Sequence, residues 1–135
     1  MPAGRTLIDC TNALDHRDFT LTNPATAESL AQALPGVNVV KAFNLAPDSA
    51  WRNPPANLGV PFCGDADLET VAELIKDVGG VPVPAGALSR AKLLEATAAL
   101  AIGIWATGGD VRSTFVSVTD AVGDSLDAIR PARSA

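Results

Sequence analysis

Chemically reactive side chains are scarce in this sequence of 135 residues, which has one histidine and two cysteines. His16 lies in a polar stretch, and we interpret it as a solvated loop residue rather than a catalytic base. Cys10 and Cys63 belong to no Cys-x-x-Cys pair and no His/Cys cluster, which argues against a metal site. The sequence also has no Gly-x-Ser-x-Gly turn and no phosphate-binding P-loop. Serine hydrolases and phosphoryl-transfer enzymes are therefore poor candidates.

Positive charge and long apolar runs are also limited. The 10 basic and 15 acidic residues give a net charge of −5, whereas nucleic-acid binding needs clustered lysine and arginine. The longest apolar stretch, Ala96 to Ala106, is much shorter than the roughly 20 residues that cross a bilayer. No signal peptide precedes the first strand-like run. We expect a cytoplasmic protein with no nucleic-acid partner and no membrane partner.

Strand-like and helix-like segments alternate along the chain. Hydrophobic residues make up 47% of the sequence and charged residues 19%, which is typical of a folded globular protein. We predict strands over Thr6–Thr11, Val37–Phe43, Val60–Cys63 and Val81–Pro84. Three helices are predicted. The first begins at a cap at Asn23, the second runs from caps at Asp65 and Asp67 to Val78, and the third runs from a cap at Ser89 to about Trp105. Residues 47–59 read as an irregular crossover, and Pro61 indicates an edge position or a strand start.

This alternation predicts an α/β fold, a partial Rossmann-like (doubly wound) arrangement with a mostly parallel sheet of about four strands and flanking helices. Residues 1–109 form this domain, and residues 110–135 form a helical segment, expected to Ile129, and a tail. Ligands of such sheets gather at the carboxyl ends of strands. Asn12, Lys41 and Asn44 lie there and suit hydrogen bonding to a planar cofactor, although each could serve only the local structure. Phe43 fits a core position better than a position that stacks on a cofactor.

Four segments together resemble the family of NADPH-dependent F420 reductases (F420:NADP oxidoreductases), which also includes the reductase domain of the STEAP metalloreductases. They are Thr6–Asn12, Val39–Asn44 with its "VKAFN" end, Pro61–Asp67, which is similar to "VCGDD", and Ala85–Glu95, which is similar to "AGPLSNARYLE". The segments occur in the family's order, from about residue 4 to residue 105.

The resemblance implies hydride transfer between NADPH and coenzyme F420, with a flavin as the alternative acceptor. It places the cofactors near Asn12, Lys41, Ala42, Phe43 and Asn44, with Gly64, Gly86, Leu88 and Ser89 at the border of the second cofactor. No catalytic acid or base is implied, because the cofactors carry the redox chemistry. Small-molecule electron carriers are the expected partners.

One element of that family's pattern is absent from the printed sequence. No Gly-x-Gly-x-x-Gly occurs, so the loop that binds the pyrophosphate is lacking. We therefore expect a truncated form with weak NADPH affinity. The alternatives are a non-catalytic half-domain that acts as an interaction or oligomerisation module, and a rearranged domain that binds a flavin-like ligand through the Gly64 and Gly86 loops. In each case we expect a homodimer through an apolar helix that carries Leu94, Leu100, Ala101, Ile104 and Trp105.

Overall fold

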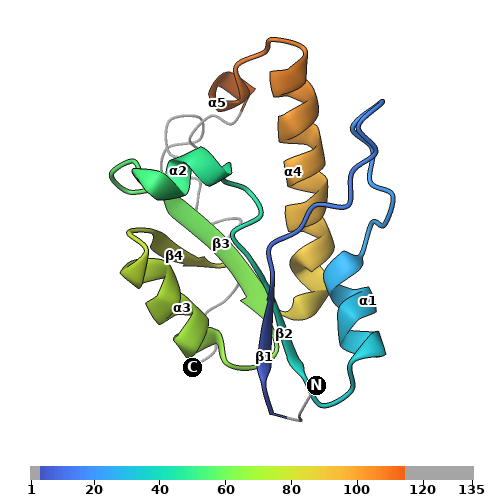
Figure 1. Ribbon diagram of the computed structural model, residues 1–135, viewed down its shortest axis with the longest axis vertical. Helices are drawn as coiled ribbons and strands as arrows, with labels where there is room; N and C mark the ends of the chain where they lie inside the picture. Colours follow the sequence, from blue (N-terminus) through green and yellow to red (C-terminus); the bar gives the residue numbers. More distant parts are fainter. Residues whose placement is uncertain (1–3, 115–135) are drawn as a thin grey trace, which may run out of the picture. The chain divides into compact units, whose positions relative to one another are not determined.

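The computed structural model describes residues 4–114 and contains one four-stranded sheet with helices on both sides (Figure 1). The strands are β1 (Thr6–Asp9), β2 (Asn38–Ala42), β3 (Gly59–Gly64) and β4 (Val81–Pro84). The helices are α1 (Thr26–Ala33), α2 (Asp48–Arg52), α3 (Leu68–Asp77), a 3-10 turn (Leu88–Arg90), α4 (Ala91–Ala106) and α5 (Val111–Thr114). The predicted fold class, a Rossmann-like α/β arrangement with a mostly parallel sheet, is confirmed.

The direction of the strands changes in the middle of the sheet. The order is β1-β2-β3-β4; β1 and β2 are parallel, as are β3 and β4, but β2 and β3 are antiparallel, with Val40 opposite Gly64. The carboxyl ends of β1 and β2 therefore lie at one end of the sheet, and those of β3 and β4 lie at the other. The single ligand-binding rim that the sequence suggested is divided into two.

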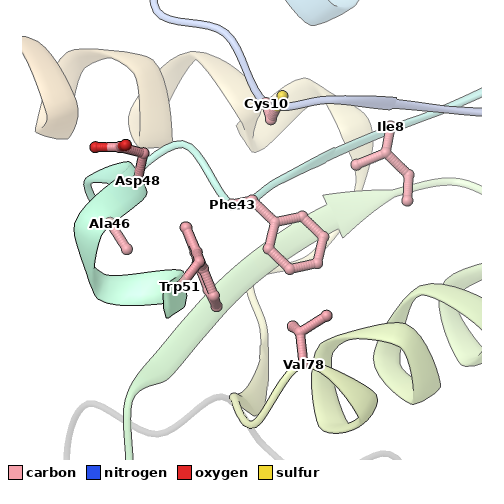
Figure 2. Close-up of a pocket in the computed structure, with 7 residues that line it drawn as sticks. All are labelled: Ile8, Cys10, Phe43, Ala46, Asp48, Trp51 and Val78. Atoms are coloured by element: carbon pink, nitrogen blue, oxygen red, sulfur yellow. The ribbon is translucent and has the colours of Figure 1, made fainter. Parts of the chain in front are cut away.

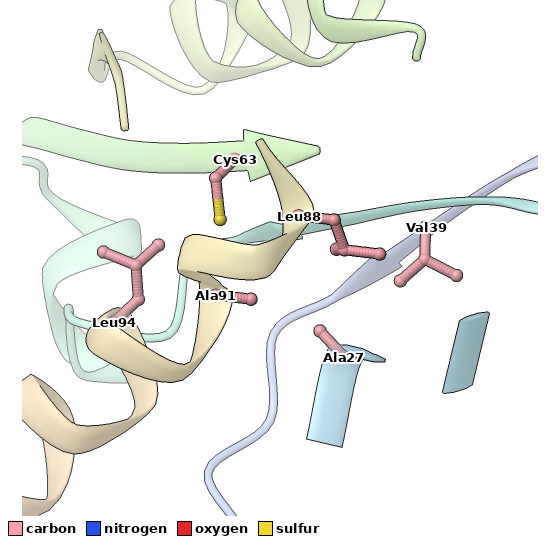
Figure 3. Packing of buried hydrophobic residues seen from close by; sticks show 6 residues of the cluster. All are labelled: Ala27, Val39, Cys63, Leu88, Ala91 and Leu94. Atoms are coloured by element: carbon pink, nitrogen blue, oxygen red, sulfur yellow. The ribbon is translucent and has the colours of Figure 1, made fainter. Parts of the chain in front are cut away.

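Apolar residues alternate along the strands, so each face of the sheet carries its own core. Helix α1 and the first half of α4 cover one face, which we call the α1/α4 face; its buried residues are Ala27, Val39, Cys63, Leu88, Ala91 and Leu94 (Figure 3). Helix α3 covers the other, the α3 face, where the buried residues are Val40, Ala42, Val60, Phe62, Val71 and Ile75. The alternation of Val39 and Val40 in β2 fixes which side chains reach each face.

Strand β3 is central, so the edge position suggested by Pro61 is wrong. The ladder to β2 covers only the last three residues of β3, Phe62 to Gly64. Pro61 precedes that ladder, where its missing N–H removes no bond to β2. The segment 47–59, predicted to be irregular, contains the short helix α2.

The predicted helix caps are also corrected, because α1, α3 and the 3-10 turn begin without a side-chain cap. Helix α1 has no side-chain cap, and Asn23 instead accepts a hydrogen bond from the Ala25 N–H at 3.1 Å. Asp67 precedes α3 but its carboxylate accepts hydrogen bonds from Thr6 and Asn38. Ser89 lies within the 3-10 turn, which has no side-chain cap.

The chain divides into two compact units, residues 1–103 and 104–135. The first contains the whole sheet. In the second, α4 ends before Gly108, whose φ of 85° suits glycine, and the Gly109 N–H donates to the Ile104 carbonyl at 2.9 Å. The predicted helix from Val111 to Ile129 begins with α5; its remainder and the predicted tail lie outside the described residues.

Candidate functional site

Three charged side chains form a buried cluster beneath the carboxyl ends of β1 and β2. The Lys41 Nζ lies 2.8 Å from Asp9 Oδ2 and 3.1 Å from Glu95 Oε1, and all three side chains are at most 1% exposed. Lys41 also donates to the Thr11 carbonyl at 2.6 Å. An ammonium group has three donors, so each donor of Lys41 has a partner. A buried charge needs this degree of compensation.

Glu95 extends the cluster to the start of α1. Its Oε2 accepts a hydrogen bond from the Thr26 N–H and its Oε1 from the Ala27 N–H, both at 3.1 Å. The first N–H groups of a helix have no partner within the helix, and they favour negative charge. Glu95 therefore caps α1 from a helix 69 residues away in the sequence. Together with Lys41, it joins α1 and α4 to the sheet.

Asp9 is held in its ionised form. Burial alone would raise its pKa, but hydrogen bonds from Lys41 and Thr11 together with the Lys41 charge outweigh burial and lower the pKa. The Thr11 N–H and hydroxyl donate to Asp9 Oδ1 at 2.9 and 2.7 Å. These bonds shape the turn that leads from β1 to Asn12.

Asn12 and Asn44 link the ends of β1 and β2. Asn12 Nδ2 donates to the Asn44 carbonyl at 2.8 Å, and Asn44 Nδ2 donates to Asn12 Oδ1 at 3.0 Å and to the Leu94 carbonyl at 3.1 Å. Asn44 is 5% exposed. Its Oδ1 is buried and has no hydrogen-bond partner among the described protein atoms. This oxygen is an acceptor without a protein donor.

A hollow of about 520 Å³ opens on the α3 face next to these strand ends (Figure 2). Its lining is mostly apolar and consists of Ile8, Cys10, Phe43, Ala46, Asp48, Trp51 and Val78. We call it the Phe43 pocket. The rings of Phe43 and Trp51 meet edge to face, with centroids 5.3 Å apart.

The backbone at Phe43 explains how its ring reaches this pocket. By strand alternation, residue 43 would share the α1/α4 face with Lys41. Its φ is 66°, in the left-handed region that bulky residues avoid, and the ring instead packs against the core of the α3 face. Such strain concentrates at functional sites.

The structure brings together only some of the predicted site residues. Asn12, Phe43 and Asn44 meet at one end of the sheet, while Lys41 and Ala42 are adjacent but fully buried. No ligand could touch either side chain in this conformation.

The other predicted residues lie at the opposite end of the sheet. The Gly64 N–H donates to the Gly86 carbonyl at 3.1 Å, and the Leu88 N–H donates to Asp65 at 3.0 Å. Ser89 is exposed in the same turn. These residues form a second loop cluster, separate from Asn12 and Asn44, and their role as ligand contacts stays a prediction.

Asp9 and Glu95 were not predicted from the sequence. Each interrupts an apolar run, Asp9 in a strand and Glu95 in a helix, and this pattern is the signal that could have identified them as buried partners of a cation. Between residues 4 and 114 there is no cluster of three or more His, Cys, Asp or Glu residues that could hold a metal ion. No helix in the same part of the chain is long and apolar enough to cross a membrane.

Comparisons with known proteins connect this chain with reductases. No family model matches it. The metalloreductase STEAP3 of Rattus norvegicus is 35% identical over 99 residues, which cover 70% of this chain and 20% of the rat protein.

Two solved structures share the fold. A protein from Arthrobacter sp. FB24, provisionally named an F420-dependent NADP reductase, matches with a TM-score of 0.68 and 26% identity over 79% of this chain and 55% of its own. A hypothetical protein from Sinorhizobium meliloti matches with a TM-score of 0.59 and 29% identity, over 64% of this chain and 47% of its own. The chain thus spans a fifth of the rat protein and about half of each matched structure. It is a Rossmann-like α/β chain whose sequence and fold are similar to those of reductases.

Proposed function

We propose that this chain is the substrate-side part of an NADPH-dependent oxidoreductase of the F420 reductase type. When bound, NADPH supplies a hydride, and coenzyme F420 or a flavin accepts it. The observation that carries the proposal is the end of the sheet where Asn12, Asn44 and the Phe43 pocket adjoin. The similarity to a metalloreductase and to a protein named as an NADP reductase supports it.

The residues at this end of the sheet fit the ring of a nicotinamide. The Phe43 pocket offers aromatic and aliphatic walls for a flat ring. Asn44 does not line this pocket; its buried side chain bonds to Asn12 and to the Leu94 carbonyl, and it holds the strand end beside the pocket in place. The phosphates have no matching glycine-rich loop in the printed sequence, so we expect binding to be weak.

The buried cluster positions these groups rather than contacting ligand. Lys41 ties β2 to β1 through Asp9 and to α4 through Glu95, and Asn44 is tied to α4 at the Leu94 carbonyl. Polar groups that are already fixed lose little conformational entropy when a ligand binds. The chain thereby holds the ring site in one geometry.

Calorimetric titration of the purified protein with NADPH, beside a thermal melt, tests this proposal. We expect sub-millimolar to millimolar binding by a folded protein, followed by NADPH oxidation at 340 nm when F420 or FMN is added. Asn12→Ala should weaken NADPH binding, because it removes a hydrogen bond that holds Asn44. Asn23→Ala, an amide outside this end of the sheet, is the matched control. A folded protein that binds no NADPH contradicts the proposal.

The second candidate is a non-catalytic interaction module that forms a homodimer through α4. Leu93 and Leu100 of this helix are 49% and 55% exposed, and they lie seven residues apart on one side of it, where exposed apolar residues that gather in a patch mark a protein–protein contact. Leu100→Lys should then convert a dimer to a monomer in light scattering, while NADPH binding is absent throughout.

A further inference from the structure

Helix α2 (Asp48–Arg52) has few contacts with the rest of the described chain. None of its residues is buried. Its charged side chains pair with each other, since Arg52 Nη2 lies 3.1 Å from Asp48 Oδ2 and the two side chains are 81% and 83% exposed. Among residues 4–114, no hydrogen bond or ion pair connects α2 to a strand or to another helix. A segment with so few buried contacts opens at a lower free-energy cost than the core of the sheet.

The chain is held on both sides of α2. Before it, the buried side chain of Asn44 is hydrogen-bonded to the turn that follows β1 and to α4. After it, Pro54 lies against the turn at the end of α3, where a Cβ at Gly79 would be 3.1 Å from Pro54 Cγ. Residues 45–53 therefore form a segment that is fixed at its two ends and weakly attached in its middle.

Trp51 is the side chain through which α2 contacts the sheet. Its ring meets that of Phe43 edge to face, with centroids 5.3 Å apart, and both rings pack against the core of the α3 face. The left-handed backbone of Phe43, with a φ of 66°, turns its ring to this face. The strained residue thus supplies the surface that Trp51 contacts. This aromatic contact is the main attachment of α2.

The same segment forms one wall of the Phe43 pocket (Figure 2). Ala46, Asp48 and Trp51 line the pocket on this side, while Ile8 of β1 and Val78 at the end of α3 line it on the other. The position of α2 therefore sets the width of the pocket. A flat ring in the pocket contacts Trp51 only while α2 lies on the sheet. Such a ligand binds one position of α2 more tightly than the other, as a population shift requires.

We propose that residues 45–53 form a lid on the Phe43 pocket: the lid opens when Trp51 leaves Phe43, and a flat ring bound in the pocket keeps it closed. That the ring is a nicotinamide or a flavin rests on the proposed function, whereas the opening of the lid is a property of this chain alone. The strand-end side of the pocket does not move with the lid, because the buried cluster beneath β1 and β2 holds it in place.

Limited proteolysis of the full chain measures how often the lid opens. Trypsin cleaves after arginine, and the bond between Arg52 and Asn53 lies within the lid. Cleavage follows the population of the open form, so Trp51→Ala should speed it about tenfold. Cleavage after Arg17, which is 89% exposed, is the internal reference. Trp105→Ala removes the other tryptophan, which is 74% exposed in α4, and should leave the ratio of the two cleavage rates unchanged.

Fluorescence quenching follows the same motion with the lid unaltered. In a Trp105→Phe background, Trp51 is the sole tryptophan, and its quenching by acrylamide reports its exposure. Saturating NADPH or FMN should lower both the quenching constant of Trp51 and the rate of cleavage after Arg52 by about twofold or more, because bound ligand favours the closed lid.

Two results overturn the proposal. The first is an equal ratio of cleavage rates in Trp51→Ala and Trp105→Ala, with thermal melts to establish that both variants are folded. The second is a ligand that binds by calorimetry and leaves both the quenching and the cleavage unchanged. If neither NADPH nor FMN binds, the proposed function fails, and the ratio of cleavage rates alone decides whether the lid exists.

Discussion

Lys41 Nζ and Glu95 Oε1 lie 3.1 Å apart, with neither side chain exposed to solvent. With Asp9 also bound to Lys41, two buried carboxylates share one ammonium group, and the N–H groups at the start of α1 offset the second negative charge. The cluster joins four elements that are far apart in the sequence.

Removal of the Lys41 charge should strongly destabilise the folded protein. Lys41→Met leaves Asp9 and Glu95 buried without a counter-charge, and such losses cost about 3–5 kcal/mol. We expect urea denaturation to show a loss of this size or no folded protein at all. The control is Lys92→Met, because Lys92 is half-exposed and lies 3.7 Å from Glu28; its loss should cost less than about 1 kcal/mol. Equal effects of the two variants would show that the cluster is not structurally important.

The lowered pKa of Asp9 predicts the direction of acid sensitivity. The pKa is lower in the folded state than in the unfolded chain, where it is about 3.9. The stability that ionised Asp9 contributes is therefore fully present above about pH 5 and is lost as the pH falls through the folded pKa.

Asp9→Asn should remove this contribution. The variant should be less stable than the wild type at pH 7, and the difference between them should shrink as the pH is lowered below 4. Chemical denaturation at a series of pH values measures the difference. A difference that is constant from pH 7 to pH 3 would be inconsistent with a lowered pKa at Asp9.

The two cysteines should differ in reactivity. Cys10 is exposed and Cys63 is buried, and burial raises the pKa of Cys63 to about 11, only partly opposed by Lys41 and Arg90. The thiolate is the reactive form. A thiol reagent such as DTNB should label Cys10 in the native protein and Cys63 only after unfolding in urea. Cys10→Ser should abolish the rapid phase; rapid labelling that persists in this variant would place Cys63 near solvent.

The order of strands and helices was predictable because apolar spacing and turn residues mark it locally. Gly79 and Gly80 end α3, as predicted, and their N–H groups bond back to the Lys76 and Ile75 carbonyls. The reversal between β2 and β3 was not predictable, since strand direction depends on how the chain between residues 43 and 58 crosses the sheet. That reversal is why Gly64 and Gly86 lie apart from Asn12 and Asn44.

The candidate site was predictable only where its residues lie at strand ends. Asn12 and Asn44 followed from this rule, and their mutual hydrogen bonds show that they meet there; their role as ligand contacts stays a prediction. Lys41 was singled out as a cofactor contact, but its partners come from β1 and α4. Nothing local in the sequence specifies a contact across 54 positions between Lys41 and Glu95.

Two glycines in similar chain positions should respond in opposite ways to an added methyl group. At Gly80, a Cβ would lie 2.8 Å from Val60 Cγ2 and 3.1 Å from the Ile75 carbonyl oxygen. Overpacking of this kind costs about 1–3 kcal/mol, and the carbonyl belongs to the end of α3 and cannot simply rotate away. At Gly59, the nearest atom is Val83 Cγ2 at 3.5 Å, an ordinary contact.

Alanine at Gly59 should therefore be neutral or stabilise the protein by up to about 1 kcal/mol, because it restricts the unfolded chain. Urea denaturation of Gly80→Ala and Gly59→Ala measures both effects on one scale. If Gly80→Ala were as stable as the wild type, α3 would have to move away from β3 to make room for the added methyl group. The close packing of Val60 and Ile75 would then not be the reason that residue 80 is a glycine.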